Sequence, residues 1–359
     1  MVLGTQDAIR LEFCTMRVSA IIVGLALLNA SGANYAAAQS ALPRILVIAT
    51  GGTIAGEQLE PGGLGPYNIK KSVNEVVALV PQVKNYAQVE TEQFSNVPSP
   101  NITPDQWLKL ARRINAVFNT RPDIAGIVDT HGTARLEETA FFLHLTVKSD
   151  KPVVVLGAQR PPTGISPDGP INLLSAIRVA AATQARNKGV LVVMDDRVIS
   201  ARDAQKLYAR NGGFSADEMG MIGVVATQGV EFFYEPVRRH TVRAEFDVDQ
   251  ITSLPRVDVN YSYAGSEGSG RTDAKAIIVA TTGFTPGERN YYEALQKKGV
   301  VIATTFPSGD HVGSPTVDRD TFPVIVVQRL LPTHARILMM LALSKTQDPR
   351  EIQRIFEEY

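Results

Sequence analysis

A short stretch near residue 50 constrains the fold of this chain more than any other. Residues 45–49 (Ile-Leu-Val-Ile-Ala) are all apolar and mostly β-branched, which predicts a strand buried on both faces, as in a parallel sheet. Thr50-Gly51-Gly52-Thr53 follows at once, and its glycines permit positive φ and close backbone approach. Functional residues of open α/β sheets gather at the carboxyl ends of strands, so a threonine hydroxyl is well placed here. The alternative is a phosphate-binding turn, but the glycine motifs typical of nucleotide loops are absent from the sequence.

Strand-like and helix-like segments alternate over residues 41–231, which predicts an α/β domain with a parallel sheet and helices on both faces. A polar linker is expected at 232–256, followed by a smaller α/β domain at 257–359. The predicted strands are Ile45–Ala49, Ile124–Asp129, Pro152–Leu156, Val190–Met194, Ala276–Ala280, Val300–Thr304 and Pro323–Val327. The predicted helices are Pro104–Phe118, Glu137–Thr146, Gly169–Ala185, Arg289–Lys298 and Ala335–Leu343.

Residues 1–40 have the pattern of a secretory signal rather than of a folded segment. An apolar run at 18–28 follows Arg17, and small residues lead to a cleavage site near Ala38. The run is shorter than the roughly 20 residues that cross a bilayer, so no membrane association is expected after cleavage. Met16 is an alternative start. An untargeted, disordered tail is the competing interpretation.

Composition excludes several classes of function. The sole cysteine lies in the predicted signal, at position 14, so the mature chain has no disulfide or thiolate chemistry. Lysine plus arginine (36) equals aspartate plus glutamate (36), which argues against nucleic acid and anionic membranes as partners. The five histidines are isolated in sequence, without metal-ligand spacing, so we expect no metal.

Two motifs resemble the signatures of the bacterial L-asparaginase family, type II. The first is Thr50–Gly56, and the second is Thr130-His131-Gly132-Thr133 with Glu137–Ala140 behind it. Two spaced motifs in the right order are far more specific than either alone. Further similarity is found in Gly157–Pro161, Asp168–Leu173, Val192–Asp196 and Asp348-Pro349, so that the resemblance covers about residue 42 to the end.

The resemblance implies four catalytic residues. Thr53 would be the nucleophile that forms an acyl-enzyme, helped by Tyr67 from a Gly- and Pro-rich loop with the composition of a mobile lid. Thr133 would be paired with Lys206, which is a base only if burial depresses its pKa. The residues alone leave other interpretations open: a surface tyrosine, a helix N-cap at Thr133 and a solvated lysine. His131 is interpreted as structural.

The positions expected to bind substrate depart from the family pattern. They are Gly52, Ser99, Gly132, Ala134 and Arg135. Ala134 replaces the family's aspartate for the substrate ammonium, and Pro100 replaces a glutamine after Ser99. In the second domain, an asparagine and a glutamate that reach a neighbouring subunit's site fall approximately at Phe284 and Thr316.

These features predict an exported amidohydrolase of the L-asparaginase type. The resemblance implies hydrolysis of the side-chain amide of L-asparagine, with L-glutamine as a further substrate, without a cofactor and in a homotetramer built as two dimers. Two alternatives stay open. One is an amidase or esterase for a related acid without a free amine, and the other is a periplasmic binding protein with weak catalysis.

Overall fold

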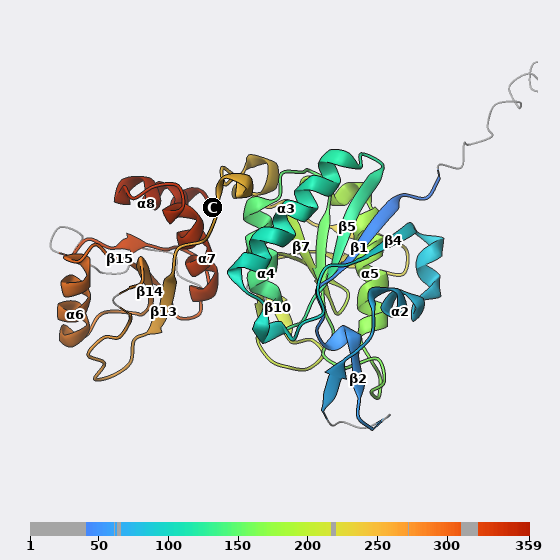
Figure 1. The fold of residues 1–359 in the computed structure, drawn as a ribbon, viewed down its shortest axis with the longest axis horizontal. Helices are drawn as coiled ribbons and strands as arrows, with labels where there is room; N and C mark the ends of the chain where they lie inside the picture. The colour runs from blue at the N-terminus through green and yellow to red at the C-terminus, as the bar shows by residue number, and fades with distance from the viewer. Residues whose placement is uncertain (1–40, 61, 63–65, 217–219, 272, 310–321) are drawn as a thin grey trace, which may run out of the picture. The chain divides into compact units, whose positions relative to one another are not determined.

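The computed structural model describes residues 41–60, 62, 66–216, 220–271, 273–309 and 322–359. The predicted signal segment and Thr316 therefore lie outside the described residues. Residues Pro43–Tyr359 form one compact unit. This unit contains a large sheet and a smaller sheet, each with its own helices (Figure 1).

The large sheet has eight strands, five of them parallel. Their spatial order is β12 (Val230–Phe232), β11 (Met221–Val225), β8 (Arg197–Ser200), β7 (Val190–Met194), β6 (Val153–Leu156), β5 (Ile124–Thr130), β1 (Arg44–Ala49) and β4 (Gln88–Gln93). The predicted parallel arrangement is confirmed for β1, β5, β6 and β7, and β4 adds a further parallel strand at the edge. Beyond β7 the sheet continues antiparallel. The change of direction follows from the tight turn at Asp195 and Asp196, whose φ angles of 53° and 60° suit a two-residue hairpin.

Helices cover both faces of this sheet, as predicted (Figure 1). One face carries α3 (Pro104–Thr120) and α4 (Leu136–Thr146), and the other carries α2 (Val73–Ala78) and α5 (Gly169–Ala181). Helix α3 begins at Pro104 because the side chain of Thr103 accepts a hydrogen bond from Gln106 N. Helix α5 ends before the predicted Ala185, since residues 183–185 form a separate 3-10 turn, η4 (Thr183–Ala185).

The smaller sheet is parallel throughout. Its order is β13 (Val257–Tyr261), β14 (Ala276–Ala280), β15 (Val301–Thr305) and β16 (Ile325–Val326), and its helices are α6 (Pro286–Gln296), α7 (Pro332–Leu343) and α8 (Pro349–Glu358). Helix α6 starts earlier than predicted because Thr285 and Glu288 form a capping box.

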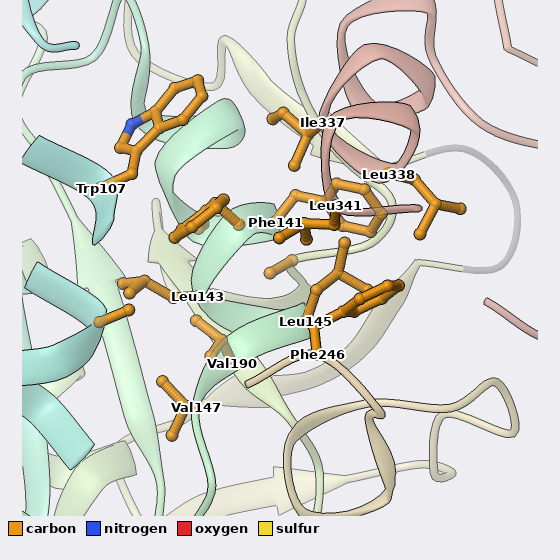
Figure 2. Close-up of a cluster of buried hydrophobic side chains, with 14 of the residues drawn as sticks. Trp107, Phe141, Leu143, Leu145, Val147, Val190, Phe246, Ile337, Leu338 and Leu341 are labelled. Atoms are coloured by element: carbon orange, nitrogen blue, oxygen red, sulfur yellow. The ribbon is translucent and has the colours of Figure 1, made fainter. Parts of the chain in front are cut away.

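A continuous apolar cluster joins elements from both halves of the sequence. Helices α4 and α7 are in contact, and Phe141, Ile337 and Leu341 meet in this cluster (Figure 2). Val248, from the segment expected to be a polar linker, is 1% exposed and belongs to it. That segment contains two 3-10 turns, η5 (Thr241–Arg243) and η6 (Val248–Gln250).

Two small hairpins flank the carboxyl ends of the parallel strands. They pair β2 (Gly56–Gln58) with β3 (Tyr67–Ile69) and β9 (Ala204–Lys206) with β10 (Phe214–Ala216). The remaining turns are η1 (Thr53–Ala55), η2 (Pro81–Asn85) and η3 (Ser99–Asn101). A helix of the length and apolarity needed to cross a membrane is not found in the described part of the chain.

Candidate active site

The site is built where the loops after β1 and β5 meet. These strands are parallel neighbours, so their carboxyl ends emerge at the same edge of the sheet. The backbone N and the Oγ1 of Thr50 both donate to Thr130 O at 3.0 Å. Gly52, with φ 88°, lies so close to the second loop that a Cβ there would be 2.2 Å from Gly132 Cα. A side chain at position 52 would therefore push the two loops apart.

Ser99, from η3, fixes the second loop from the other side. Its Oγ donates to Gly132 O at 2.5 Å and accepts from Arg135 N at 2.9 Å. A Cβ on Gly132 would be 2.4 Å from Ser99 Cβ, so this contact also needs glycine. Three of the predicted substrate-binding positions, Gly52, Ser99 and Gly132, thus lie together in the closest packing of the site.

The first predicted catalytic pair is formed. Thr53 starts η1 directly after Gly52 and is 7% exposed. Its Oγ1 lies 2.6 Å from Tyr67 Oη, within hydrogen-bond distance. Tyr67 reaches it because β3 folds back antiparallel on β2, with Tyr67 opposite Gln58. Tyr67 is 39% exposed, so this pair lies at the border between the buried loop and solvent.

The second predicted pair is also formed. Lys206 Nζ donates to Thr133 Oγ1 at 2.6 Å, although the residues are 73 positions apart in sequence. Thr133 is 6% exposed and Lys206 is half-buried. Burial lowers the pKa of Lys206, while the negative charge of Glu137 raises it. The solvated-lysine interpretation is therefore wrong, and so is the N-cap interpretation of Thr133, since the residue at the N-cap of α4 is Arg135.

His131 lies beside the pairs but is engaged elsewhere. Trp107 Nε1 donates to Thr139 Oγ1 at 2.8 Å, so that hydroxyl has its own proton free for His131 Nε2 at 2.9 Å. Nδ1 then carries the ring proton and donates to Gly132 O at 2.8 Å. Burial lowers the pKa of His131 to about 4, which keeps the ring neutral. Both nitrogens hold the loop in place, in agreement with the predicted structural role.

The remaining predicted positions differ in their surroundings. Ala134 and Arg135 are exposed, and the Arg135 guanidinium lies 3.4 Å from the carboxylate of Glu138. Phe284 packs edge-on against Phe322 and Tyr292, with ring centroids 5.2 and 5.7 Å away, as part of the packing of the smaller sheet.

Two acidic residues of the site region were missed by the sequence interpretation. Glu137, in the first turn of α4, accepts a hydrogen bond from Lys206 N at 2.5 Å. Asp129 precedes the second loop in β5, opposite Ile48 and Val155. In sequence, the first lies in an expected helix and the second at the end of an expected strand. The only sequence signal for Asp129 is an acidic residue at the end of an otherwise apolar strand, since charged residues are rarely buried.

Asp129 is fully buried, and among the described residues its carboxyl oxygens have no well-formed hydrogen bond. Burial raises the pKa of Asp129 to about 8, although the nearby Thr50 hydroxyl favours the charged form and lowers the pKa slightly, so the folded state holds its proton more tightly than the unfolded state. The contribution of the Asp129 carboxyl to the unfolding free energy is therefore fully present at low pH and is lost as pH rises toward 8. Asp129→Asn should remove that loss, flattening the pH slope of the unfolding free energy by up to about 1.4 kcal/mol per pH unit.

Urea unfolding between about pH 5 and pH 8 measures the slope in wild type and variant. Asp105→Asn removes an exposed carboxyl at the start of α3 and is the matched control. Equal slopes in wild type and Asp129→Asn would show that the Asp129 carboxyl is solvated or paired.

Among the described residues, no group of three or more His, Cys, Asp or Glu side chains is arranged to hold a metal ion.

Comparisons with known proteins point to one family along nearly the whole described chain. The family model "Asparaginase, N-terminal" matches residues 44–238, and the model "Glutaminase/Asparaginase C-terminal domain" matches residues 256–356. L-asparaginase 2 of Bacillus subtilis (strain 168) is 41% identical over 328 residues, which cover 89% of this chain and 87% of that protein. Glutaminase-asparaginase of Pseudomonas fluorescens biotype A is 37% identical over 342 residues, covering 92% and 94%.

A solved structure is similar over the same extent. The crystal structure of a probable cytoplasmic L-asparaginase from Campylobacter jejuni has a TM-score of 0.82 and 37% sequence identity, and the match covers 88% of this chain and 100% of that chain.

Proposed function

The chain belongs to the asparaginase family of amidohydrolases, and we propose that it hydrolyses the side-chain amide of L-asparagine, and secondarily of L-glutamine, to the acid and ammonia. The observation that carries this proposal is that two threonines, on adjacent loops, each have a side chain with an ionisable group within hydrogen-bond distance. Thr53 Oγ1 lies 2.6 Å from Tyr67 Oη, and Thr133 Oγ1 lies 2.6 Å from Lys206 Nζ. The two threonines are on loops that meet at Gly52 and Gly132.

In the acylation step, Thr53 Oγ1 attacks the amide carbon. Its hydroxyl proton passes by way of Tyr67 Oη to the amide nitrogen, the carbon–nitrogen bond breaks, and ammonia leaves. An ester between the substrate acyl group and Thr53 is left. Backbone N–H groups of the two glycine-containing loops are the available donors for the developing oxyanion.

In the deacylation step, water attacks the ester carbon while the Thr133–Lys206 couple takes the water proton. The proton then returns to Thr53 Oγ1, so the acid is released and the hydroxyl is restored. A neutral Lys206 is needed for this role, and the burial that lowers its pKa favours the neutral form.

The alternative substrate is an asparagine whose amine is acylated or peptide-linked. Arg135 is directed to Glu138 and Ala134 adds no charge, so these positions give a substrate ammonium no counter-ion. We further propose export to the periplasm or medium on the signal-like segment at 1–40. A homotetramer of two dimers is the proposed assembly, and light scattering measures its mass.

Ammonia release from L-asparagine, L-glutamine and N-acetyl-L-asparagine by the purified chain tests the proposal. We expect release from asparagine that is faster than from glutamine. Release from the N-acetyl compound alone would favour the acylated substrate class. If no compound releases ammonia but one raises the melting temperature, the chain is a binding protein and the proposed hydrolysis is wrong.

A further inference from the structure

Lys206 is held at two points, and the second one lies outside the catalytic pairs. Its Nζ donates to Thr133 Oγ1 at 2.6 Å, and its backbone N–H donates to Glu137 Oε2 at 2.5 Å. Strand β9 pairs antiparallel with β10, with Lys206 opposite Phe214, and α4 contacts β9 directly. The Glu137 carboxyl therefore joins the helix that begins after Thr133 to the strand that carries Lys206.

Glu137 also supplies the negative charge that acts on the lysine. Among the described residues, it is the carboxyl group whose charge raises the pKa of Lys206, against the lowering caused by burial. Ala134, which lies next to Thr133, contributes no charge. Glu137 is thus placed to govern how readily Lys206 gives up its proton.

The other charged groups around Glu137 have partners of their own. Glu138 lies 3.4 Å from Arg135 and 3.7 Å from Arg336 of α7. His334, also from α7, is fully buried, and burial lowers its pKa to about 4, so it adds no charge near neutral pH. Burial raises the pKa of Glu137 to about 7. The hydrogen bond from the Lys206 backbone N–H opposes this rise, as do the positive charges of Arg135 and Lys206, whereas the negative charge of Glu138 adds to it.

We propose that Glu137 is the positioning residue of Lys206: it anchors the lysine's strand against Thr133 and balances the charge of the ammonium. This inference rests on the proposed function only where Lys206 acts as a base. The placement of Glu137 in the first turn of α4 offers a simpler structural role, as an acidic residue at a helix start. Glu138 occupies the same turn and provides the comparison that separates the two roles.

The direct test is the titration of Lys206 by NMR, in protein with ¹³C-labelled lysine side chains. The Lys206 signal is assigned by its absence in Lys206→Met. Glu137→Gln keeps an oxygen acceptor but loses the charge, so the Lys206 midpoint should fall by on the order of one pH unit. Glu138→Gln is the matched control and should leave the midpoint within about 0.3 unit of wild type. Glu137→Asp keeps the charge and should restore most of the shift.

An unchanged midpoint in Glu137→Gln would overturn the inference, as would equal shifts in the two glutamine variants. The pH profile of ammonia release separates this failure from failure of the proposed function. If the wild-type rate rises with pH at the Lys206 midpoint, and this rise is absent in Lys206→Met, Lys206 acts as the base whatever the effect of Glu137. If the midpoint moves in Glu137→Gln while the profile does not, Glu137 acts on Lys206 but Lys206 is not the base.

Discussion

Replacing Thr53 by alanine is expected to lower kcat for amide hydrolysis by several orders of magnitude while leaving the fold and ligand binding nearly intact. The variant removes the oxygen that would form the ester, and the methyl group of alanine fits the 7%-exposed position without a new contact. The hydrogen bond lost to Tyr67 is at the border with solvent, where water replaces it.

Thr53→Ser is the matched control for this loss. It keeps the hydroxyl beside Tyr67 and should retain measurable hydrolysis, with kcat far above that of the alanine variant. Activity of Thr53→Ala within tenfold of wild type would move the nucleophile to Thr133.

The second large effect concerns the substrate amine. Ala134→Asp combined with Arg135→Thr should raise kcat/KM for asparagine by about thirtyfold or more, because a charge-assisted pair to an ammonium is worth about 2–5 kcal/mol when desolvated. The same change should lower activity toward N-acetylasparagine, since an unpaired carboxylate would then face an apolar group. The two rates must therefore move in opposite directions.

Ala134→Asn with Arg135→Thr is the control, because it adds a polar side chain of the same size without charge. Pro100 limits the gain, since its ring has no donor for the substrate carboxylate. An unchanged ratio between the two substrates in the aspartate variant would mean that position 134 does not face the bound substrate.

The family and the fold class were predictable from sequence, and both are confirmed. The central strands were predictable because both of their faces are buried, which leaves continuous apolar runs such as Val190–Met194. Strand β4 was missed because it lies at the sheet edge and its sequence, QVETEQ, is almost entirely polar. Helix α8 was missed although Asp348 and Pro349 mark its start and its apolar residues Ile352, Ile355 and Phe356 have helical spacing.

The four proposed catalytic residues could be named from the resemblance of their motifs to a family, but not from the residue types and their neighbours in sequence. Tyr67 and Lys206 are brought to the threonines by two short hairpins, and nothing in their own sequences distinguishes them from surface residues. The contact of Lys206 with Glu137 depends on the packing of α4 against β9, so it could be read only from the structure. The antiparallel extension beyond β7 depends on a two-residue turn that the alternation of strands and helices does not reveal.

An ester between the substrate acyl group and Thr53 is the intermediate on which the proposed mechanism depends, and trapping that ester tests the mechanism most directly. Wild-type protein is mixed with the amide substrate that it turns over, quenched in acid within the first turnover, digested and analysed by mass spectrometry. We expect an added acyl mass on the peptide that contains Thr53, and no such mass in Thr53→Ala. An acyl mass on the peptide that contains Thr133, or a full burst of ammonia without any acylated peptide, would contradict it.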